Sequence, residues 1–324
     1  MADLERVKRQ FEAVLHNVTD DVRSQLLCWI KCKINSGEWG DVTKENSNED
    51  VMLESIQSDL RSELPVNAMS QTESIHFPQT GPNADCDPNT TVHVDAFLYD
   101  DDAIDDLCEE GKMSRSYCTR CGSQEVQPLT FITHSASATQ VKYIFNYALP
   151  DLSGKIVLDV GSRTGAVLYG AYLYSKAKHI VGVEIDSTFT RLQTAVVAKY
   201  NMADRIQVIH DDILNQGQLL MSSDVVILNN VFEFFVPKDL QEKLWIHLFA
   251  TLKNDTILVT IPSLEESLQP LKTGINLEKC VESIDLTAPL QQGRQELLDC
   301  DDTDDSDLTR INLYRVLAPH SPCQ

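Results

Sequence analysis

The sequence lacks any apolar run that approaches the roughly 20 residues of a membrane-spanning helix, which excludes a membrane-embedded class of protein. The first residues, MADLERVKRQFEAVL, are charged and lack the apolar centre of a signal peptide. Without a secretory route, the nine cysteines are expected to be reduced thiols and not a disulfide framework. We therefore expect an intracellular protein, cytoplasmic or nuclear.

Positive charge is also scarce. The chain of 324 residues has 27 Lys and Arg against 49 Asp and Glu, a formal net charge of −22. Because nucleic acids are held by basic surfaces, we expect no direct general contact with nucleic acid. The acidic balance is compatible with a basic protein partner or with solvated acidic loops.

Composition divides the chain into segments. Residues 1–40 carry apolar residues at three- and four-residue spacing and predict N-terminal helices. Residues 41–95 have few apolar residues and predict a disordered, acidic and polar linker. Residues 96–135 combine AFLYDDDAIDDLC, which predicts a short helix, with the cysteine segment SYCTRCGS. Residues 136–318 alternate apolar strands with helices and form the main domain.

The cysteine segment resembles a zinc knuckle, because Cys118 and Cys121 flank a turn that is followed by glycine. A tetrahedral structural site needs four ligands, and the sequence lacks a second CxxC. Cys108 and His134 are the nearest residues that could complete the site. A structural zinc site and unliganded cysteines both stay open. Redox use is less favoured, because the motif does not open a helix after a strand.

The main domain is organised around residues 155–186, KIVLDVGSRTGAVLYGAYLYSKAKHIVGVEID. This stretch reads as a buried strand, a glycine turn, a helix and a second buried strand. Further strand–helix alternation predicts an α/β fold with a doubly wound, mostly parallel sheet. Residues 280–286 and 311–316 read as two late strands, separated by the acidic loop at 299–307.

Polar side chains follow successive strands of this sheet. They are Asp159 with the loop 161–165, Glu184 with Asp186, Asp211 with Asp212, and Asn229 with Asn230. Backbone N–H groups of a glycine loop can hold a carboxylate or phosphate, and an acid after the second strand can accept ribose hydroxyl hydrogens. Asp212 could accept from an adenine amino group. The pattern predicts a nucleoside-containing cofactor.

These residues carry a resemblance to a known family. LDVGSRTG, VGVEID and HDDI resemble, in order, the first, second and adenine-contacting motifs of the class I S-adenosylmethionine-dependent methyltransferases. The resemblance covers about residues 139–316, and it implies a seven-stranded sheet whose late strands form an antiparallel pair. It also implies S-adenosylmethionine as cofactor. The implied cofactor contacts are Asp159, Gly161, Ser162, Gly165, Glu184, Asp212 and Asn229.

One departure from the family pattern lies in the glycine loop. The family commonly has a small residue, usually glycine, where this chain has Arg163. An arginine there could narrow the loop or compete for the pocket of the cofactor's carboxylate. Alternatively, it could point outward, or help to neutralise that carboxylate.

The residues at the end of the fourth predicted strand bear on the identity of the methyl acceptor. LNNVFEFF is loosely similar to the (Asn/Asp)-Pro-Pro-(Tyr/Phe) signature of amino-group methyltransferases, with Asn230 and Val231 in place of the prolines. It also weakly resembles the Asn-Asn-Phe stretch of Dot1-like lysine methyltransferases. The resemblance implies Asn229, Asn230 and Phe232 as catalytic residues that orient an amine. The competing interpretation is a strand terminus followed by core aromatics.

Together these features predict methyl transfer from S-adenosylmethionine to a protein nitrogen, more finely a lysine, with a protein substrate as partner. An inactive methyltransferase-like domain that serves as a binding partner or scaffold is the main alternative. It rests on Arg163, the missing prolines and the acidic extensions. A small-molecule or RNA methyltransferase is a further alternative.

Overall fold

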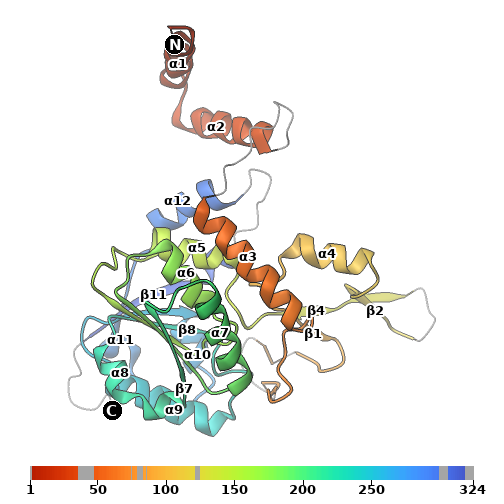
Figure 1. Ribbon diagram of the computed structural model, residues 1–324, viewed down its shortest axis with the longest axis vertical. Coiled ribbons are helices and arrows are strands. Elements are labelled where there is room, and N and C mark those ends of the chain that lie inside the picture. Colours follow the sequence, from red (N-terminus) through yellow and green to blue (C-terminus); the bar gives the residue numbers. More distant parts are fainter. Residues whose placement is uncertain are drawn as a thin grey trace.

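The computed structural model describes residues 2–35, 47–73, 75–78, 83–84, 86–120, 125–298 and 306–317. Its centre is a seven-stranded sheet with the order β10-β11-β9-β8-β5-β6-β7 (Figure 1). Its strands are β5 (Ile156–Val160), β6 (His179–Glu184), β7 (Ile206–His210), β8 (Val225–Asn229), β9 (Ile257–Ile261), β10 (Val281–Ser283) and β11 (Asn312–Val316). The strands from β5 to β9 pair in parallel, whereas β11 runs antiparallel to both β9 and β10. This confirms the predicted mostly parallel sheet and its late antiparallel pair.

Alternating side chains of the strands divide the core into two layers. In β5, Val157 packs on one face of the sheet and Leu158 on the other, as expected for strands covered on both sides. The first layer packs against α5 (Ala138–Tyr143), a following π-helical turn (Ile144–Ala148), α6 (Ala166–Tyr174), α7 (Ser187–Lys199), α12 (Thr287–Leu297) and α13 (Ser306–Thr309). The second layer packs against the 3₁₀ turn Ile213–Asn215, α8 (Gly217–Ser222), α9 (Lys238–Thr251), α10 (Leu264–Leu268) and α11 (Leu277–Cys280).

Helix α12 was not predicted from the sequence. It lies between the two late strands and packs on the first helical layer, where a Cβ atom on Gly293 would come within 2.6 Å of the ring of Tyr143. The absence of a side chain there allows the helix to approach α5 closely. The acidic loop predicted at 299–307 lies outside the described residues up to residue 305.

The N-terminal helices agree with the sequence pattern. Helix α1 (Ala2–His16) and helix α2 (Asp20–Asn35) are separated by a short break. Apolar side chains of α1 are exposed, with Phe11 at 40% and Val7 at 50%. Within the described ranges, no helix is both long and apolar enough to cross a membrane.

The predicted disordered linker over residues 41–95 needs correction. Helix α3 (Asn48–Glu63) begins after Ser47, whose side chain accepts a hydrogen bond from the Asp50 N–H group. It buries Leu53, Ile56 and Leu60 in the first core layer. The stretch has few apolar residues, but these three lie on one face of the helix and are at most 1% exposed. Residues 41–46 lie outside the described part of the chain.

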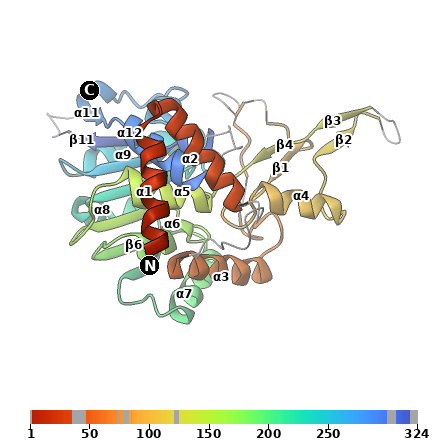
Figure 2. The same ribbon diagram turned by 90° about the horizontal axis from the view of Figure 1, so that it is seen from above.

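A small outlying region joins α3 to the sheet. It contains β1 (Thr91–His93), α4 (Asp101–Glu109), β2 (Ser116–Cys118), β3 (Val126–Pro128) and β4 (Thr130–Ile132). Strand β1 pairs in parallel with β4, and β2 pairs antiparallel with β3. Figure 2 shows these short strands and α4 on one side of the main sheet. Helix α4 lies within the stretch where a short helix was predicted.

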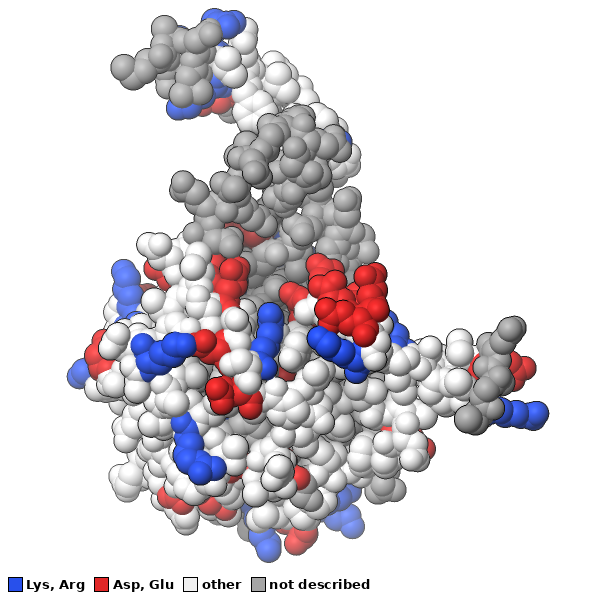
Figure 3. All heavy atoms as spheres, turned by 45° about the vertical axis from the view of Figure 1, so that its right-hand side comes forward, with Lys and Arg blue, Asp and Glu red and all other residues white. Residues whose placement is uncertain are grey.

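The charges on the visible face agree with the acidic composition. Figure 3 shows a dense group of Asp and Glu side chains, with Lys and Arg scattered singly across the same face. Helix α4 contributes exposed acids, among them Asp101, Asp102 and Asp105.

Candidate functional site

A cavity of about 560 Å³ lies at the carboxyl ends of strands β5, β6, β7 and β8. This is the edge at which open parallel sheets bind their ligands. Of the predicted site residues, Gly161, Glu184, Asp212, Asn229, Asn230 and Phe232 line the cavity, whereas Asp159, Ser162 and Gly165 do not. The lining also includes Thr72, Glu73 and His134, which precede the main sheet in the chain.

The glycine loop approaches the fourth strand end closely. Gly161 has φ +70°, and a Cβ atom at this position would lie 2.4 Å from Cγ2 of Val231. Gly165 has φ +88° and precedes the first residue of α6. The Ser162 hydroxyl donates to the Gln193 side chain at 2.9 Å and is buried. Ser162 and Gly165 therefore shape the loop, while Gly161 borders the cavity.

Arg163 is held by the N-terminal part of the protein. Its Nε atom donates to Oε1 of Glu73 at 3.0 Å, one terminal nitrogen donates to Oδ2 of Asp95 at 2.8 Å, and the other donates to the carbonyl oxygen of Ala68 at 2.8 Å. The guanidinium also lies over the ring of Phe189, 5.0 Å from its centre. These partners occupy the donors with which Arg163 could have competed for a cofactor carboxylate.

The segment 68–73 therefore borders the site, and its residues Thr72 and Glu73 line the cavity. Arg163 anchors this segment through Ala68 and Glu73, and the Thr72 hydroxyl donates to Asp186. The backbone N–H of His76 donates to the carbonyl oxygen of Phe234 at 2.7 Å. Sequence reasoning missed this segment, because it lies in the stretch that was predicted to be a linker.

Two buried carboxyl groups belong to this region: Glu184 lines the cavity, and Asp159 does not. Asp159 is 3% exposed, and burial together with the nearby Glu184 raises its pKa to about 8. Burial also raises the pKa of Glu184, although its carboxylate accepts hydrogen bonds from the backbone N–H groups of Asp186 and Arg163, each at 2.8 Å. Each oxygen of Glu184 has further acceptor capacity for a ligand hydroxyl.

The two acids after β7 differ in how many further hydrogen bonds their carboxylates can accept. Asp211 accepts from the side chains of Asn215 at 2.8 Å and Gln216 at 2.6 Å, and from the Asp212 N–H group. Asp212 accepts from the Leu214 N–H group at 2.9 Å. Asp211 is the more fully hydrogen-bonded of the pair, so the geometry favours Asp212 as the ligand contact.

The fourth strand end brings the predicted catalytic residues to the cavity. Asn229 Nδ2 lies 3.5 Å from the carbonyl oxygen of His134, and its buried Oδ1 atom has no hydrogen-bond partner among the described residues. Asn230 adopts φ +47°, and its Nδ2 lies 3.5 Å from the carbonyl oxygen of Thr133. Phe232 is 6% exposed and packs edge-on against Trp245. Phe232 is thus both core and lining.

The zinc prediction gains no support. Within the described ranges, no group of three or more His, Cys, Asp or Glu residues is placed to hold a metal, and Cys121 lies outside those ranges. Cys118 is exposed on β2, and Cys108 is partly exposed at the end of α4. His134 is instead paired with another histidine, since its Nε2 lies 2.9 Å from Nδ1 of His93.

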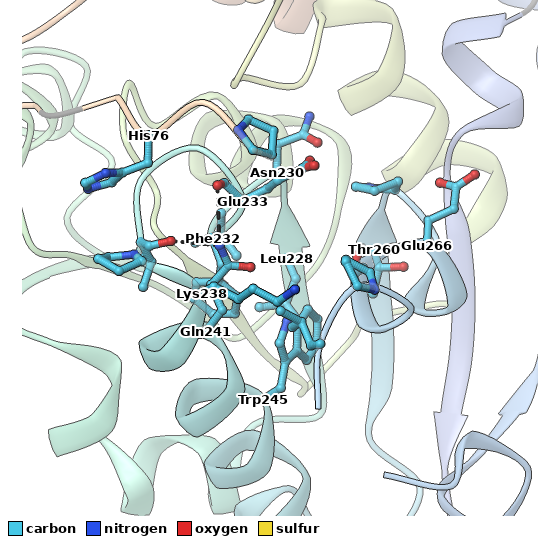
Figure 4. Close-up of a pocket in the computed structure, with 18 of the residues that line it drawn as sticks. His76, Leu228, Asn230, Phe232, Glu233, Lys238, Gln241, Trp245, Thr260 and Glu266 are labelled. Carbon is cyan, nitrogen blue, oxygen red and sulfur yellow. Dashed lines mark hydrogen bonds between the residues drawn. The ribbon is translucent and has the colours of Figure 1, made fainter. Parts of the chain in front are cut away.

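A second cavity of about 280 Å³ adjoins the first (Figure 4). The two share Asn230, Val231, Phe232, Val236 and Pro237 as lining residues. Its lining residues include Trp245, the charged residues Glu233, Glu266 and Lys238, and Thr260, whose buried Oγ1 has no hydrogen-bond partner in the described structure. Burial raises the pKa of Glu233.

Comparisons with known proteins give structures but no sequence families. No protein-family model matches the sequence, and no curated protein matches it. Among solved structures, an RNA methyltransferase from Salinibacter ruber in complex with S-adenosyl-L-homocysteine is 17% identical, with a TM-score of 0.33 over 52% of this chain and 85% of that chain. Precorrin-6y C5,15-methyltransferase from Geobacter metallireducens is 14% identical, with a TM-score of 0.34 over 45% of this chain and 73% of that chain.

The strand order carries the fold assignment. Strand β5 is the central one of the five parallel strands β9-β8-β5-β6-β7, and β11 is inserted antiparallel between β9 and β10. The glycine loop follows β5, the acid Glu184 ends β6, and Asn229 ends β8. The chain therefore has the doubly wound, seven-stranded, mostly parallel sheet that the resemblance in its sequence implied.

Proposed function

We propose that this protein transfers a methyl group from S-adenosylmethionine to a protein nitrogen. The observation that carries the proposal is the larger cavity, which Gly161, Glu184, Asp212 and Asn229 line from four successive strand ends. Its volume of about 560 Å³ lies within the usual range for small-molecule sites, about 300–1,000 Å³. The loop at Gly161 leaves no room for a side chain.

The residues present fit this cofactor. Glu184 would accept hydrogens from the ribose hydroxyls, Asp212 would accept from the adenine amino group, and the buried carboxyl of Asp159 would balance the ammonium of the methionine portion. When bound, S-adenosylmethionine supplies an electrophilic methyl group on a sulfonium. The protein contributes by positioning the acceptor and excluding water.

The second cavity supports a nitrogen acceptor that arrives on a long side chain. Its aromatic wall at Trp245 and Phe232 suits an aliphatic stem. Its lining has two acidic residues, Glu233 and Glu266, against one basic residue, Lys238, and this balance favours a basic group. It meets the first cavity at Asn230 and Phe232. A lysine side chain combines both properties, and we propose it as the finer assignment.

Calorimetry with S-adenosylhomocysteine tests the cofactor assignment. We expect saturable binding by the wild-type chain and a loss of about 10²-fold in affinity for Glu184→Gln, because hydrogen bonds to a charged acceptor contribute about 1.5–3 kcal/mol each. Glu282→Gln, at an exposed pair with Arg315, is the matched control and should bind like the wild type. No saturable binding by the wild-type chain would contradict the proposal.

Transfer itself is tested with tritiated S-adenosylmethionine and a cell lysate. We expect label in protein, at lysine after mass-spectrometric mapping, and much less with Glu184→Gln. Label confined to RNA or to small molecules would contradict the protein acceptor. Cofactor binding without any transfer would instead identify a non-catalytic, methyltransferase-like domain.

A further inference from the structure

The arginine in the glycine loop adopts an uncommon backbone conformation. Arg163 has φ +42°, in the left-handed region that favours glycine. The peptide groups on both sides of its Cα atom are nevertheless fixed. Its N–H group donates to Oε2 of Glu184 at 2.8 Å, and its carbonyl oxygen accepts from Nε2 of Gln193 at 2.6 Å. A strained conformation of this kind persists only where the surrounding structure imposes it.

The side chain of Arg163 supplies this constraint. It is 9% exposed and forms ion pairs with Glu73 and Asp95, whose side chains are 8% and 0% exposed. Its second terminal nitrogen donates to the carbonyl oxygen of Ala68 at 2.8 Å. Each nitrogen of the guanidinium therefore has a partner, and the planar group is held in one orientation. All three partners precede the main sheet in the chain.

The N–H group that is fixed in this way acts on the acid at the end of β6. Glu184 lines the larger cavity, and each of its carboxylate oxygens accepts one backbone N–H group, from Arg163 and from Asp186. Burial raises the pKa of Glu184, while these two hydrogen bonds lower it. Without the N–H group of residue 163, the carboxylate would lose one of the two contacts that fix its plane and favour its charged form.

We propose that Arg163 is a positioning residue, whose buried ion pairs hold its backbone at positive φ and thereby orient the Glu184 carboxylate for the ribose hydroxyls of the cofactor. The inference rests on the proposed function and deepens it, because it gives Glu73 and Asp95 a role in cofactor affinity. Glycine would adopt this backbone conformation without an anchor. In this chain the arginine and its two carboxylate partners maintain it, so cofactor affinity depends on residues that lie outside the sheet domain.

Two variants that differ by one methyl group separate the backbone conformation from the lost charge. Arg163→Ala and Arg163→Gly are each combined with Asp95→Asn and Glu73→Gln, so that no buried charge lacks a partner. Both variants lose the anchor, but only alanine is strained at positive φ. The alanine variant should therefore bind S-adenosylhomocysteine about tenfold more weakly than the glycine variant in calorimetry. A role of Arg163 in packing alone predicts equal affinities or the opposite order.

A second ligand shows whether the effect passes through Glu184. An analogue of S-adenosylhomocysteine that lacks both ribose hydroxyls has no hydrogen to donate to this carboxylate. Its affinity, measured by displacement calorimetry, should differ by less than about twofold between the alanine and glycine variants, because the two changes then act independently. Arg315→Ala, at the exposed pair with Glu282, is the control and should bind both ligands like the wild type.

Hydrogen exchange of the wild-type chain gives a test that needs no variant. The Arg163 N–H group should exchange slowly in the full chain before any ligand is added, because the anchor already holds it on Glu184. NMR of the chain with labelled arginine measures this rate. Exchange as fast as in an unstructured peptide would overturn the positioning role.

The outcomes distinguish this inference from the proposed function. Equal affinities of the alanine and glycine variants for S-adenosylhomocysteine would overturn the positioning role and leave the cofactor assignment standing. An equally large difference for the analogue without ribose hydroxyls would do the same, because the effect would then not pass through Glu184. A wild-type chain that fails to bind S-adenosylhomocysteine would overturn the proposed function, and with it the ribose contact that the positioning role serves.

Discussion

Replacement of Arg163 by methionine should lower the free energy of unfolding by about 3–5 kcal/mol, because it leaves buried carboxylates without a counter-charge. The side chains of Asp95 and Glu73 are 0% and 8% exposed, and Arg163 is their ion-pair partner. Methionine keeps much of the apolar stem of arginine. It also leaves the backbone strain of the positive φ at residue 163 unchanged, whereas glycine would relieve that strain and obscure the effect of the lost charge. Urea denaturation followed by circular dichroism measures the change.

An exposed ion pair gives the matched control. Arg315 lies 3.3 Å from Glu282, and the two side chains are 49% and 62% exposed. Because water screens such pairs, Arg315→Met should change stability by at most about 1 kcal/mol. Addition of Asp95→Asn and Glu73→Gln to Arg163→Met should recover part of the loss, since no buried charge then lacks a partner. Equal effects at residues 163 and 315 would refute the anchoring role of Arg163.

Replacement of Asp159 by asparagine should change how stability depends on pH. The pKa of Asp159 is raised to about 8 in the folded protein, against about 3.9 in an unfolded chain. The folded state therefore binds a proton more tightly than the unfolded state. Its contribution to stability is complete below about pH 3.9 and is lost as pH rises through about 8, a total change on the order of 5 kcal/mol.

Asp159→Asn removes this pH-dependent contribution to the free energy of unfolding. The stability of the variant relative to the wild type should therefore rise with pH. The difference between the two proteins isolates Asp159 from other titrating groups, and urea denaturation from about pH 5 to 8 measures it. Saturating S-adenosylhomocysteine should reduce the difference, because its ammonium would favour the charged carboxylate. Parallel stability curves for the two proteins without ligand would show that Asp159 has an ordinary pKa.

The sheet and its glycine loop could be predicted because local sequence specifies them. The strand Ile156–Val160 is a short run rich in β-branched residues, and the turn after it contains glycines that adopt positive φ. The polar residues lie at strand ends: Glu184 and Asn229 are the last residues of β6 and β8, and Asp212 comes shortly after β7. Once the strands pair in parallel, these residues must meet at one edge.

The contacts that complete the site could not be predicted, because they join residues far apart in the chain. Arg163 and Glu73 are 90 residues apart, and His93 and His134 are 41 apart. No periodicity or motif relates such pairs. The sequence suggested His134 as a ligand that could complete a zinc site with Cys118 and Cys121. In the structure its ring contacts a second histidine, His93, which no motif indicated. Arg163 departs from the glycine pattern of the family that the sequence resembles. Its structural role became visible only through its distant partners Glu73 and Asp95.

The segment 68–73 makes the larger cavity a composite of two parts of the chain. The strand ends supply the floor and its acids, but Thr72 and Glu73 border the same cavity, and Asp95 neutralises the arginine inside the glycine loop. A sheet domain cut at residue 136 would keep every motif and lose this enclosure. The site is therefore not a transferable module, because its walls come from segments that lie far apart in the chain.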